Sequence, residues 1–312
     1  MDKQFDLKNI KKIFMLYNRH SGKQLFNLTH FKIKETQRLI KVRFGFEVVE
    51  LVEIERFDQI GTIAERIKEE QVDWVIIAGG DGTIRAALEK LVNLNYRPFI
   101  SIFPSGTVNL VAKELQLSSL PQSWLKRLLK GRIMPVYFGW ANNNLFLTVA
   151  SAGFDSLVVE NVTEREKLFL NKLAYVFEGG ELIGREVLFS NWRYRFQVRF
   201  DDEEQWVEGS SVIVGKSRYY AGRYNIFKQA ALDNPKLYAA VMTGAKKVDF
   251  LAYAANMCLE NLDENENVII RDCEKLSIKC NVEGFAVELD GDAITATPLE
   301  IVLDKEPLYF VC

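Results

Sequence analysis

The fold is decided by the stretch VDWVIIAGGDGTIRAALEKL, which spans residues 72–91. Its first part, residues 72–78, is a near-continuous apolar run of the kind found in strands buried on both faces. The run stops at Gly79-Gly80. Apolar residues then recur three and four apart, at Ile84, Ala87, Leu88 and Leu91. This spacing is typical of an amphipathic helix. The stretch therefore predicts a strand, a glycine-rich loop and a helix in immediate succession.

Similar patterns lie on both sides of this stretch. Short apolar runs predict strands at residues 11–17, 46–52 and 98–103. Apolar residues at helical spacing predict a helix over residues 60–67, and a helix-like stretch lies near residues 110–115. Buried strands that alternate with helices favour a parallel sheet covered on both faces. Residues 1–135 are therefore expected to form an α/β domain of Rossmann-like, nucleotide-binding type.

After Gly131 the pattern changes to that of antiparallel strands. Residues 192–200 alternate strictly between aromatic or apolar and polar side chains, the period of a strand with one buried face. Residues 133–140 and 145–150 flank a turn-forming segment and predict a hairpin. Further strands are expected at 206–214, 237–242, 268–271, 276–280, 286–289, 299–303 and 308–311, with helices near 164–183 and 247–260. Residues 136–312 are therefore expected to form a β-rich, sandwich-like domain.

The composition excludes several classes of protein. The chain has 312 residues and a formal net charge of -2, which excludes a strongly basic nucleic-acid binder. Two histidines, His20 and His30, cannot build a histidine-rich zinc site. The four cysteines include no Cys-x-x-Cys pair, which argues against zinc-ribbon and thioredoxin-like functions. No apolar run approaches the ~18 residues that span a bilayer, so we expect a cytoplasmic protein that touches membranes only from outside.

The loop Gly79-Gly80-Asp81-Gly82-Thr83 is the sharpest candidate for a functional site. Open α/β sheets bind their ligands at the carboxyl ends of strands, where this loop is expected. Glycines let backbone N–H groups approach a phosphate, and the Thr83 hydroxyl can bind a phosphate oxygen or cap the helix. The Asp81 carboxylate would repel phosphates unless Mg²⁺ or a proton-transfer role accompanies it. The alternative is a tight glycine turn, which leaves the aspartate unexplained.

Two other strand ends carry similar loops. Pro104-Ser105-Gly106-Thr107-Val108-Asn109 follows the strand at 98–103, and NRHSG at 18–22 follows the strand at 11–17. Each loop alone is also compatible with an ordinary turn. Together, three polar, glycine-containing turns at three strand ends predict a nucleotide pocket.

These motifs carry a resemblance to a known family. AGGDGTI at 78–84, followed by PSGTVN at 104–109, resembles the diacylglycerol kinase and sphingosine kinase family of lipid kinases, including its bacterial members. NAD kinases and 6-phosphofructokinases share the GGDGT motif, and the PSGTVN pattern favours the lipid kinases. The similarity extends to Asn18 with Ser21-Gly22, SAGFD at 151–155, YYAG at 219–222 and DGD at 290–292.

The resemblance implies ATP as the phosphate donor, together with Mg²⁺. It implies that Asp81 organises the metal or its water network, and sphingosine kinases are thought to use the matching aspartate as a base. ATP would be contacted by residues of all three loops: Asn18, Gly79, Gly80, Asp81, Gly82, Thr83, Ser105, Gly106, Thr107 and Asn109.

The resemblance also implies catalytic carboxylates near the C-terminus. Bacterial lipid kinases carry Asp-Gly-Glu there, whereas this chain has Asp290-Gly291-Asp292, whose second acid is one methylene shorter. The residues alone favour an ordinary β-turn. With the resemblance, we expect the catalytic base to be Asp290 or Asp292, with Asp81 as the alternative base. Mutual repulsion between the two turn aspartates can raise the pKa of one of them.

A second departure lies at residues 232–237, LDNPKL. The family often has Asp-Gly in this loop, which holds a structural Mg²⁺, whereas this chain has Asn234-Pro235. Asparagine offers only a neutral carbonyl, and proline cannot occupy a left-handed turn. These departures argue against a second metal site, and we do not expect the neighbouring Asp233 to take the place of the missing aspartate.

Basic and apolar stretches bear on the partner. Basic residues crowd residues 32–43 and 124–130, where they form either solvated helix faces or a surface that attracts anionic membranes. The apolar stretch at 168–184 is either core or a groove for acyl chains.

The expected function is transfer of the γ-phosphoryl group of ATP to a lipid hydroxyl in the cleft between the domains. We expect a peripheral membrane enzyme of phospholipid biosynthesis. The oligomeric state is left open, with a homodimer as one alternative. The acceptor is left open among diacylglycerol, phosphatidylglycerol and sphingoid bases. Two alternatives are an NAD kinase-like enzyme and a catalytically impaired protein that binds nucleotide or lipid.

Overall fold

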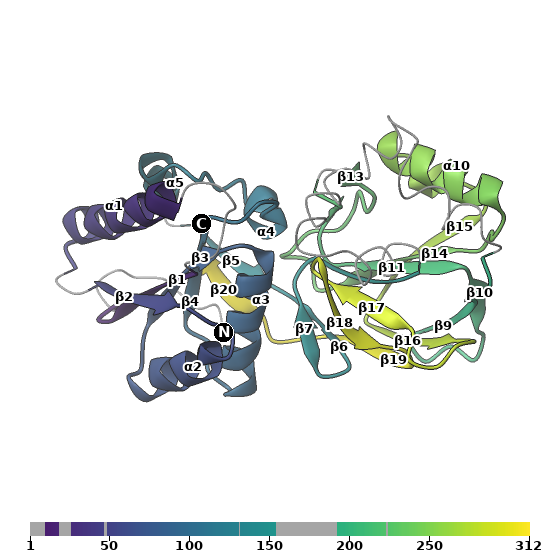
Figure 1. Ribbon diagram of the computed structural model, residues 1–312, viewed down its shortest axis with the longest axis horizontal. Coiled ribbons are helices and arrows are strands. Elements are labelled where there is room, and N and C mark those ends of the chain that lie inside the picture. Colours follow the sequence, from purple (N-terminus) through teal and green to yellow (C-terminus); the bar gives the residue numbers. More distant parts are fainter. Residues whose placement is uncertain (1–9, 19–25, 47–48, 131, 154–191, 223) are drawn as a thin grey trace. The chain divides into compact units, whose positions relative to one another are not determined.

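The computed structural model describes residues 10–18, 26–46, 49–130, 132–153, 192–222 and 224–312. The chain divides into two compact units (Figure 1). The first unit comprises Met1–Tyr137 with Glu306–Cys312, and the second comprises Phe138–Lys305. Each unit has its own sheets and its own hydrophobic core.

A six-stranded sheet forms the centre of the first unit. Four strands run parallel in the order β2-β1-β3-β4, β20 continues parallel to β4, and β5 is antiparallel to β20. Every residue of β1 and β3 is buried, as expected for strands covered on both faces. The strands are β1 (Ile13–Asn18), β2 (Val49–Ile54), β3 (Trp74–Gly79), β4 (Phe99–Pro104), β5 (Ile133–Val136) and β20 (Leu308–Val311).

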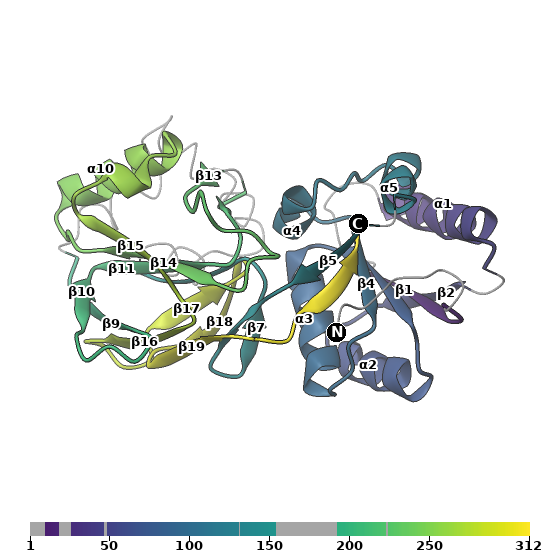
Figure 2. The same cartoon turned by 180° about the vertical axis from the view of Figure 1, so that it is seen from behind.

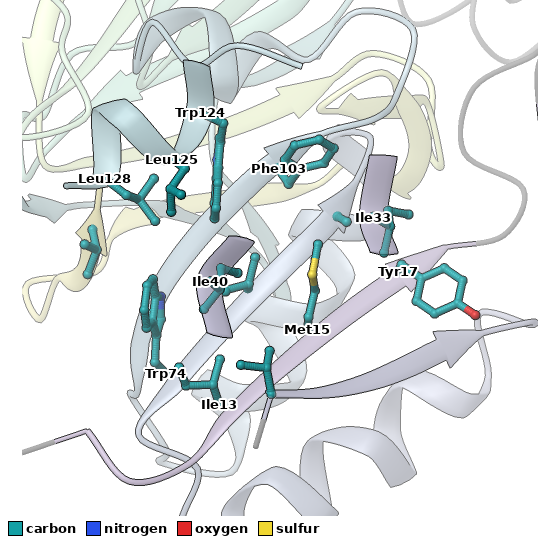
Figure 3. Packing of buried hydrophobic residues seen from close by; sticks show 14 of the residues in the cluster. Ile13, Met15, Tyr17, Ile33, Ile40, Trp74, Phe103, Trp124, Leu125 and Leu128 are labelled. Atoms are coloured by element: carbon teal, nitrogen blue, oxygen red, sulfur yellow. The ribbon is translucent and has the colours of Figure 1, made fainter. Parts of the chain in front are cut away.

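Helices cover both faces of this sheet (Figure 1 and Figure 2). On one face α1 (Phe26–Phe44) packs beside α5 (Pro121–Leu128), and on the other α2 (Gln59–Glu69) packs beside α3 (Asp81–Asn93). Figure 3 shows the core beneath α1 and α5, where side chains of both helices meet alternate residues of the strands. Its members include Ile13, Met15, Tyr17, Ile33, Ile40, Trp74, Phe103, Trp124, Leu125 and Leu128.

The C-terminal strand belongs to the first unit. β20 lies between β4 and β5, and the Ser101 hydroxyl donates a hydrogen bond to the Val311 carbonyl oxygen at 2.7 Å. The Cys312 N–H donates to the Arg132 carbonyl oxygen at 3.0 Å. With the domain boundary expected between residues 135 and 136, residues 308–311 would fall in the second domain, whereas β20 lies in the sheet of the first unit. An apolar run indicates a buried strand but does not identify its neighbours in the sheet.

The second unit is built from antiparallel strands. One sheet has the order β10-β9-β16-β19-β6-β7, a second has the order β15-β14-β11-β8-β17-β18, and β12 pairs with β13. Among its described residues, the helical elements are α10 (Lys247–Cys258) and the 3₁₀ turn η2 (Leu262–Glu264). The strands are β6 (Gly139–Ala141), β7 (Asn144–Phe146), β8 (Val149–Ala152), β9 (Phe196–Phe200), β10 (Val207–Gly209), β11 (Ser211–Gly215), β12 (Tyr219–Tyr220), β13 (Tyr224–Asn225), β14 (Leu237–Met242), β15 (Val268–Cys273), β16 (Lys275–Cys280), β17 (Ala286–Leu289), β18 (Asp292–Ala296) and β19 (Leu299–Leu303).

These two architectures confirm the expected fold class, a parallel α/β domain followed by an antiparallel β-rich domain. The predicted strand at 192–200 is shorter than expected, because β9 begins at Phe196. The helix expected at 164–183 and the apolar stretch at 168–184 lie outside the described residues. In the part of the chain that the structure describes, no helix is both long and apolar enough to cross a membrane.

Candidate functional site

The first group of candidate residues lies at the ends of three adjacent strands. β1, β3 and β4 are neighbours in the sheet, so their carboxyl ends meet at one edge. Asn18 ends β1, and its side-chain Nδ2 donates a hydrogen bond to Oγ1 of Thr83 at 3.0 Å. Both residues are buried. This bond joins the end of β1 to the loop after β3. Residues 19–22, from the same candidate loop as Asn18, lie outside the described residues.

Glycines let the loops after β3 and β4 touch through their backbones. A Cβ atom on Gly106 would lie 2.4 Å from the Cα of Gly80, closer than side chains approach in proteins. A Cβ atom on Gly79 would lie 2.7 Å from the Cβ of Thr83. The Ser105 N–H donates to the Gly79 carbonyl oxygen at 3.3 Å. The contact between the two loops therefore depends on glycine at position 106, and the close approach of Thr83 to the end of β3 depends on glycine at position 79.

The Asp81 carboxylate links the first loop to the helix after the second. Its Oδ2 accepts a hydrogen bond from the Leu110 N–H at 3.0 Å, and its Oδ1 accepts one from the Val111 N–H at 3.3 Å. These donors open α4 (Leu110–Glu114), where the first N–H groups have no partner within the helix. Asp81 is half-buried, and its carboxylate caps the start of α4.

The second loop is closed by its own asparagine. Asn109 has a left-handed backbone, with φ of 54°. Its side chain accepts the Gly106 N–H at 2.9 Å and donates to the Gly106 carbonyl oxygen at 2.7 Å. Thr107 is exposed at the tip of the loop. The Ser105 Oγ is different, since it is buried and no described residue is its hydrogen-bond partner. Leaving a buried hydroxyl unpaired costs free energy, which a bound ligand can offset.

This edge of the sheet suits a phosphate group. The 13-residue helix α3 begins at Asp81, and the start of a helix carries a partial positive charge. Gly82 and Thr83 lie in its first turn. The glycine backbones leave room that side chains would fill, and Ser105 offers an unused hydroxyl. The described residues contain no cluster of three or more His, Cys, Asp or Glu.

The second group of candidates lies in the hairpin between β17 and β18. Asp290 and Gly291 both have a left-handed φ, 51° and 95°, which suits a two-residue hairpin turn. The buried Asp290 carboxylate accepts hydrogen bonds from the backbone N–H groups of residues 147–149 at 2.8, 2.8 and 3.1 Å. It also accepts one from the Thr148 hydroxyl at 2.6 Å. Asp290 thereby fastens the hairpin to the start of β8.

Burial raises the pKa of the Asp290 carboxyl, while hydrogen bonds from Thr148, Leu147 and Val149 act to lower it. Repulsion by Asp292 is not a cause of the shift, so the expected effect of two neighbouring aspartates is corrected to an effect of burial. Asp292 itself is half-buried at the start of β18.

A second buried carboxylate, which was not predicted from the sequence, lies beside this turn. Glu288 accepts a hydrogen bond from the Ser151 hydroxyl at 2.8 Å, and its other oxygen accepts the Gly291 N–H. Both side chains are buried in neighbouring strands, β17 and β8. An acidic residue between Val287 and Leu289, inside an apolar strand, was a usable signal. Phe154 and Asp155, which follow β8 in the matching motif, lie outside the described residues.

The loop at residues 231–236 binds the ammonium group of a buried lysine. Lys216 follows β11 and is fully buried. Its Nζ donates to the carbonyl oxygens of Ala231 at 2.5 Å and Asn234 at 2.6 Å. The Asn234 side chain donates to the Tyr238 hydroxyl at 2.9 Å. This is the loop for which the resemblance implies a structural Mg²⁺. Two of its carbonyl oxygens bind the ammonium group of Lys216 instead.

Known families match both units of the chain. Residues 12–141 match the diacylglycerol kinase catalytic domain. Residues 148–309 match the YegS C-terminal NAD kinase beta sandwich-like domain, which is more than half of the chain. The chain belongs to the diacylglycerol kinase-like family of lipid kinases. The resemblance carried by the motifs is thereby confirmed.

Individual relatives agree with this membership. A diacylglycerol kinase of Staphylococcus saprophyticus is 28% identical over 225 residues, 72% of this chain and 70% of the relative. One of Staphylococcus epidermidis is 27% identical over 225 residues, 72% of this chain and 68% of the relative. A crystal structure of a diacylglycerol kinase from Bacillus anthracis has a TM-score of 0.76 at 20% identity, over 97% of both chains, and shows the same fold.

Proposed function

We propose that the protein is an ATP-dependent lipid kinase, which transfers the γ-phosphoryl group of ATP to the hydroxyl group of a lipid. The observation that carries the proposal is the backbone contact between the loops after β3 and β4, beside a buried Ser105 hydroxyl with no partner among the described residues. Relatives named diacylglycerol kinase support a lipid as the acceptor and phospholipid biosynthesis as the setting.

The first unit would bind the phosphates of ATP. Backbone N–H groups at the start of α3 would contact phosphate oxygens, together with the hydroxyls of Ser105 and Thr107. Asn18 and Asn109 would act as positioning residues, because each holds another part of the site. Mg²⁺, when bound, neutralises charge on the β- and γ-phosphates, and Asp81 is the residue that would hold it. The full set of residues proposed for the ATP site, positioning residues included, is Asn18, Gly79, Gly80, Asp81, Gly82, Thr83, Ser105, Gly106, Thr107 and Asn109.

Of the two turn aspartates, Asp292 is the better candidate for the catalytic base. Both carboxylate oxygens of Asp290 accept hydrogen bonds from buried donors, whereas Asp292 is half-buried. In the transfer, the lipid oxygen bonds to the γ-phosphorus, the bond to the bridging oxygen of ADP breaks, and ADP leaves with that electron pair. The hydroxyl proton passes to the Asp292 carboxylate. Asp290 would position Asp292 by fastening the hairpin.

Phosphorylation of a lipid extract with labelled ATP tests this function. We expect label in one lipid class of the extract, identified by mass spectrometry. The same assay is run with diacylglycerol, phosphatidylglycerol, sphingosine and NAD as separate acceptors. Label in NAD alone would assign an NAD kinase. ATP binding without turnover on any acceptor would assign a catalytically impaired binding protein.

A pair of variants tests the identity of the base. Asp292→Asn should lower kcat with little change in ATP affinity, because the residue would act only on the hydroxyl proton. Asp81→Asn should also change the dependence of the rate on Mg²⁺. Full kcat in Asp292→Asn, together with none in Asp81→Asn, would assign the base to Asp81 instead.

A further inference from the structure

The layer formed by α1 and α5 is strongly basic. Residues 30–44 and 120–132 carry nine basic side chains and a single acidic one, Glu35. The chain as a whole has a net charge of -2, so this concentration is local. The basic residues are Lys32, Lys34, Arg38, Lys41, Arg43, Lys126, Arg127, Lys130 and Arg132.

These charges differ from those on the opposite face of the same sheet. On α2, Arg66 pairs with Glu50 and Glu70, and on α3, Arg85 pairs with Glu89. On α1, only Arg38 pairs, with Glu35 one turn away. Among the described residues of the α1 and α5 layer, no other basic side chain forms an ion pair. Apart from Arg38, the basic side chains of this face are therefore not neutralised by ion pairs with other described residues.

Large apolar side chains are exposed among these charges. Phe31 and Val42 of α1 are 66% and 67% exposed, and Leu129 beside α5 is 51% exposed. Positions 31, 34, 38 and 42 recur at helical spacing, so Phe31, Lys34, Arg38 and Val42 follow one stripe of α1. The opposite stripe, which includes Ile33 and Ile40, is buried against the strands (Figure 3). The exposed stripe is thus not needed for the core.

Both helices present this character on one side of the unit. α1 and α5 lie side by side in the two ribbon views, and their inward residues share one core (Figure 1 and Figure 2). Basic side chains mixed with exposed apolar ones match a surface that is anionic outside and apolar just beneath. An anionic lipid bilayer has this structure, whereas a nucleic acid backbone offers nothing for Val42 and Leu129 to contact.

We propose that the outer surface of α1 and α5 is a docking surface for an anionic lipid bilayer. This inference rests on the proposed function, because a lipid kinase must reach its acceptor at a membrane. The basic residues bind the headgroups, and Phe31, Val42 and Leu129 enter the apolar boundary beneath them. Docking through this layer leaves the strand ends of the first unit free to bind ATP.

Sedimentation with vesicles, measured without ATP, tests the electrostatic part. Wild-type protein should bind vesicles of phosphatidylcholine mixed with phosphatidylglycerol and should bind phosphatidylcholine alone weakly. Binding should fall with salt, as the screening length shortens from ~10 Å at 0.1 M to ~3 Å at 1 M. Each basic residue near such a surface contributes about fivefold in affinity. The combined variant Lys34→Glu, Lys126→Glu and Lys130→Glu should therefore lose at least ~100-fold.

A matched variant controls for the change in net charge. Lys11→Glu, Lys68→Glu and Lys90→Glu alter three exposed lysines elsewhere in the first unit by the same charge. This control variant should keep nearly wild-type binding. Equal losses in both variants, or none in either, would overturn the proposed surface.

Two further measurements separate the alternatives. Phe31→Ser with Leu129→Ser should weaken the vesicle binding that persists at high salt, whereas unchanged binding would overturn insertion. Stronger loss of duplex RNA binding than of vesicle binding in the lysine variant would assign the surface to nucleic acid.

Kinase activity is then measured on lipid dispersed in neutral detergent. Loss of vesicle binding with full activity there supports the surface, while absence of turnover in wild type contradicts only the proposed function.

Discussion

Asp81 in the first unit and Asp290 in the second hold their surroundings in the same way. Each carboxylate uses both oxygens to accept backbone N–H groups from a distant part of the chain. They differ in burial and in what lies beside them. Asp290 is only 7% exposed and accepts four hydrogen bonds. Asp81 is half-buried next to loops that leave the Ser105 hydroxyl without a partner among the described residues.

The difference separates a carboxylate that completes a fold from one placed beside a ligand site. At Asp290 the protein itself supplies donors to both oxygens, so the turn is satisfied without a ligand. At Asp81 the same kind of hydrogen bonding orders a helix start, and the residue is half-buried in a loop that contacts the loop carrying the Ser105 hydroxyl. The comparison predicts that Asp81 matters more for activity and Asp290 more for stability.

Replacing Asp81 should produce the largest change in activity. Asp81→Asn removes the negative charge that we propose holds Mg²⁺. One backbone N–H at the start of α4 would then face the amide NH₂ group of the asparagine. Kinase activity should fall at least ~1000-fold, about 4 kcal/mol. The free energy of unfolding should fall by only about 1 kcal/mol, the value of an exchanged hydrogen bond. Turnover assays and urea unfolding measure the two effects.

Asp73 provides a matched control at the other end of β3. Its carboxylate accepts the N–H groups of Lys11 and Lys12 at 2.8 and 2.9 Å, so it also holds backbone donors. Asp73→Asn should cost similar stability and leave turnover near the wild-type value. If Asp73→Asn and Asp81→Asn lost activity equally, the effect of Asp81 would be structural.

Replacing Asp290 should produce the largest change in stability. Asp290→Asn places an amide group among four donors, which leaves buried N–H groups unpaired. The free energy of unfolding should fall by about 3 kcal/mol, as measured by urea denaturation. Asp292→Asn should change it by less than about 0.5 kcal/mol. A stable but inactive Asp290→Asn variant would reverse the comparison and make Asp290 the base.

The sequence predicted the strand ends of the first unit well because their signals are local. β-branched runs that stop at glycine specify where a strand ends, as at Gly79, and a glycine must stand where two backbones touch. The parallel sheet and the family followed from such motifs, whereas the order of the strands in the sheet was not predicted. The contact between Gly80 and Gly106 needed only that β3 and β4 be neighbours.

Long-range partners could not be predicted in this way. The donors to Asp290 lie more than 140 residues earlier in the chain, so its sequence neighbours suggested only a turn or a base. The length of α1 was also hidden, because Thr36 is buried while Phe31 and Val42 are exposed, which blurs the helical pattern. Lys216 was hidden for the same reason, since its partners are carbonyl groups of a separate loop.

Adding one methyl group to the second loop should weaken ATP binding. Gly106→Ala would place a Cβ atom 2.4 Å from the Gly80 Cα, so the two loops must separate. We expect ATP affinity to fall at least ~10-fold by calorimetry, about 1.4 kcal/mol. Gly61→Ala is the control, because Gly61 lies in α2 with nothing near its Cβ position. It should leave affinity unchanged and stabilise the helix by up to about 1 kcal/mol. Equal affinities in both variants would show that ATP does not need the loop contact.

The smallest expected effect concerns Ser105, and it distinguishes a ligand site from a structural one. The buried Ser105 hydroxyl has no partner among the described residues, so Ser105→Ala should not lower the free energy of unfolding. ATP affinity should nevertheless fall about fivefold, near 1 kcal/mol, because a phosphate oxygen loses a donor. Ser101→Ala should behave in the opposite way. The Ser101 hydroxyl accepts Trp74 Nε1–H at 3.0 Å and donates to the Val311 carbonyl oxygen, so its loss should cost about 1–2 kcal/mol of stability and no ATP affinity. A stability loss in Ser105→Ala without any change in ATP binding would mean that its hydroxyl serves the fold, as Asp290 does, rather than a ligand.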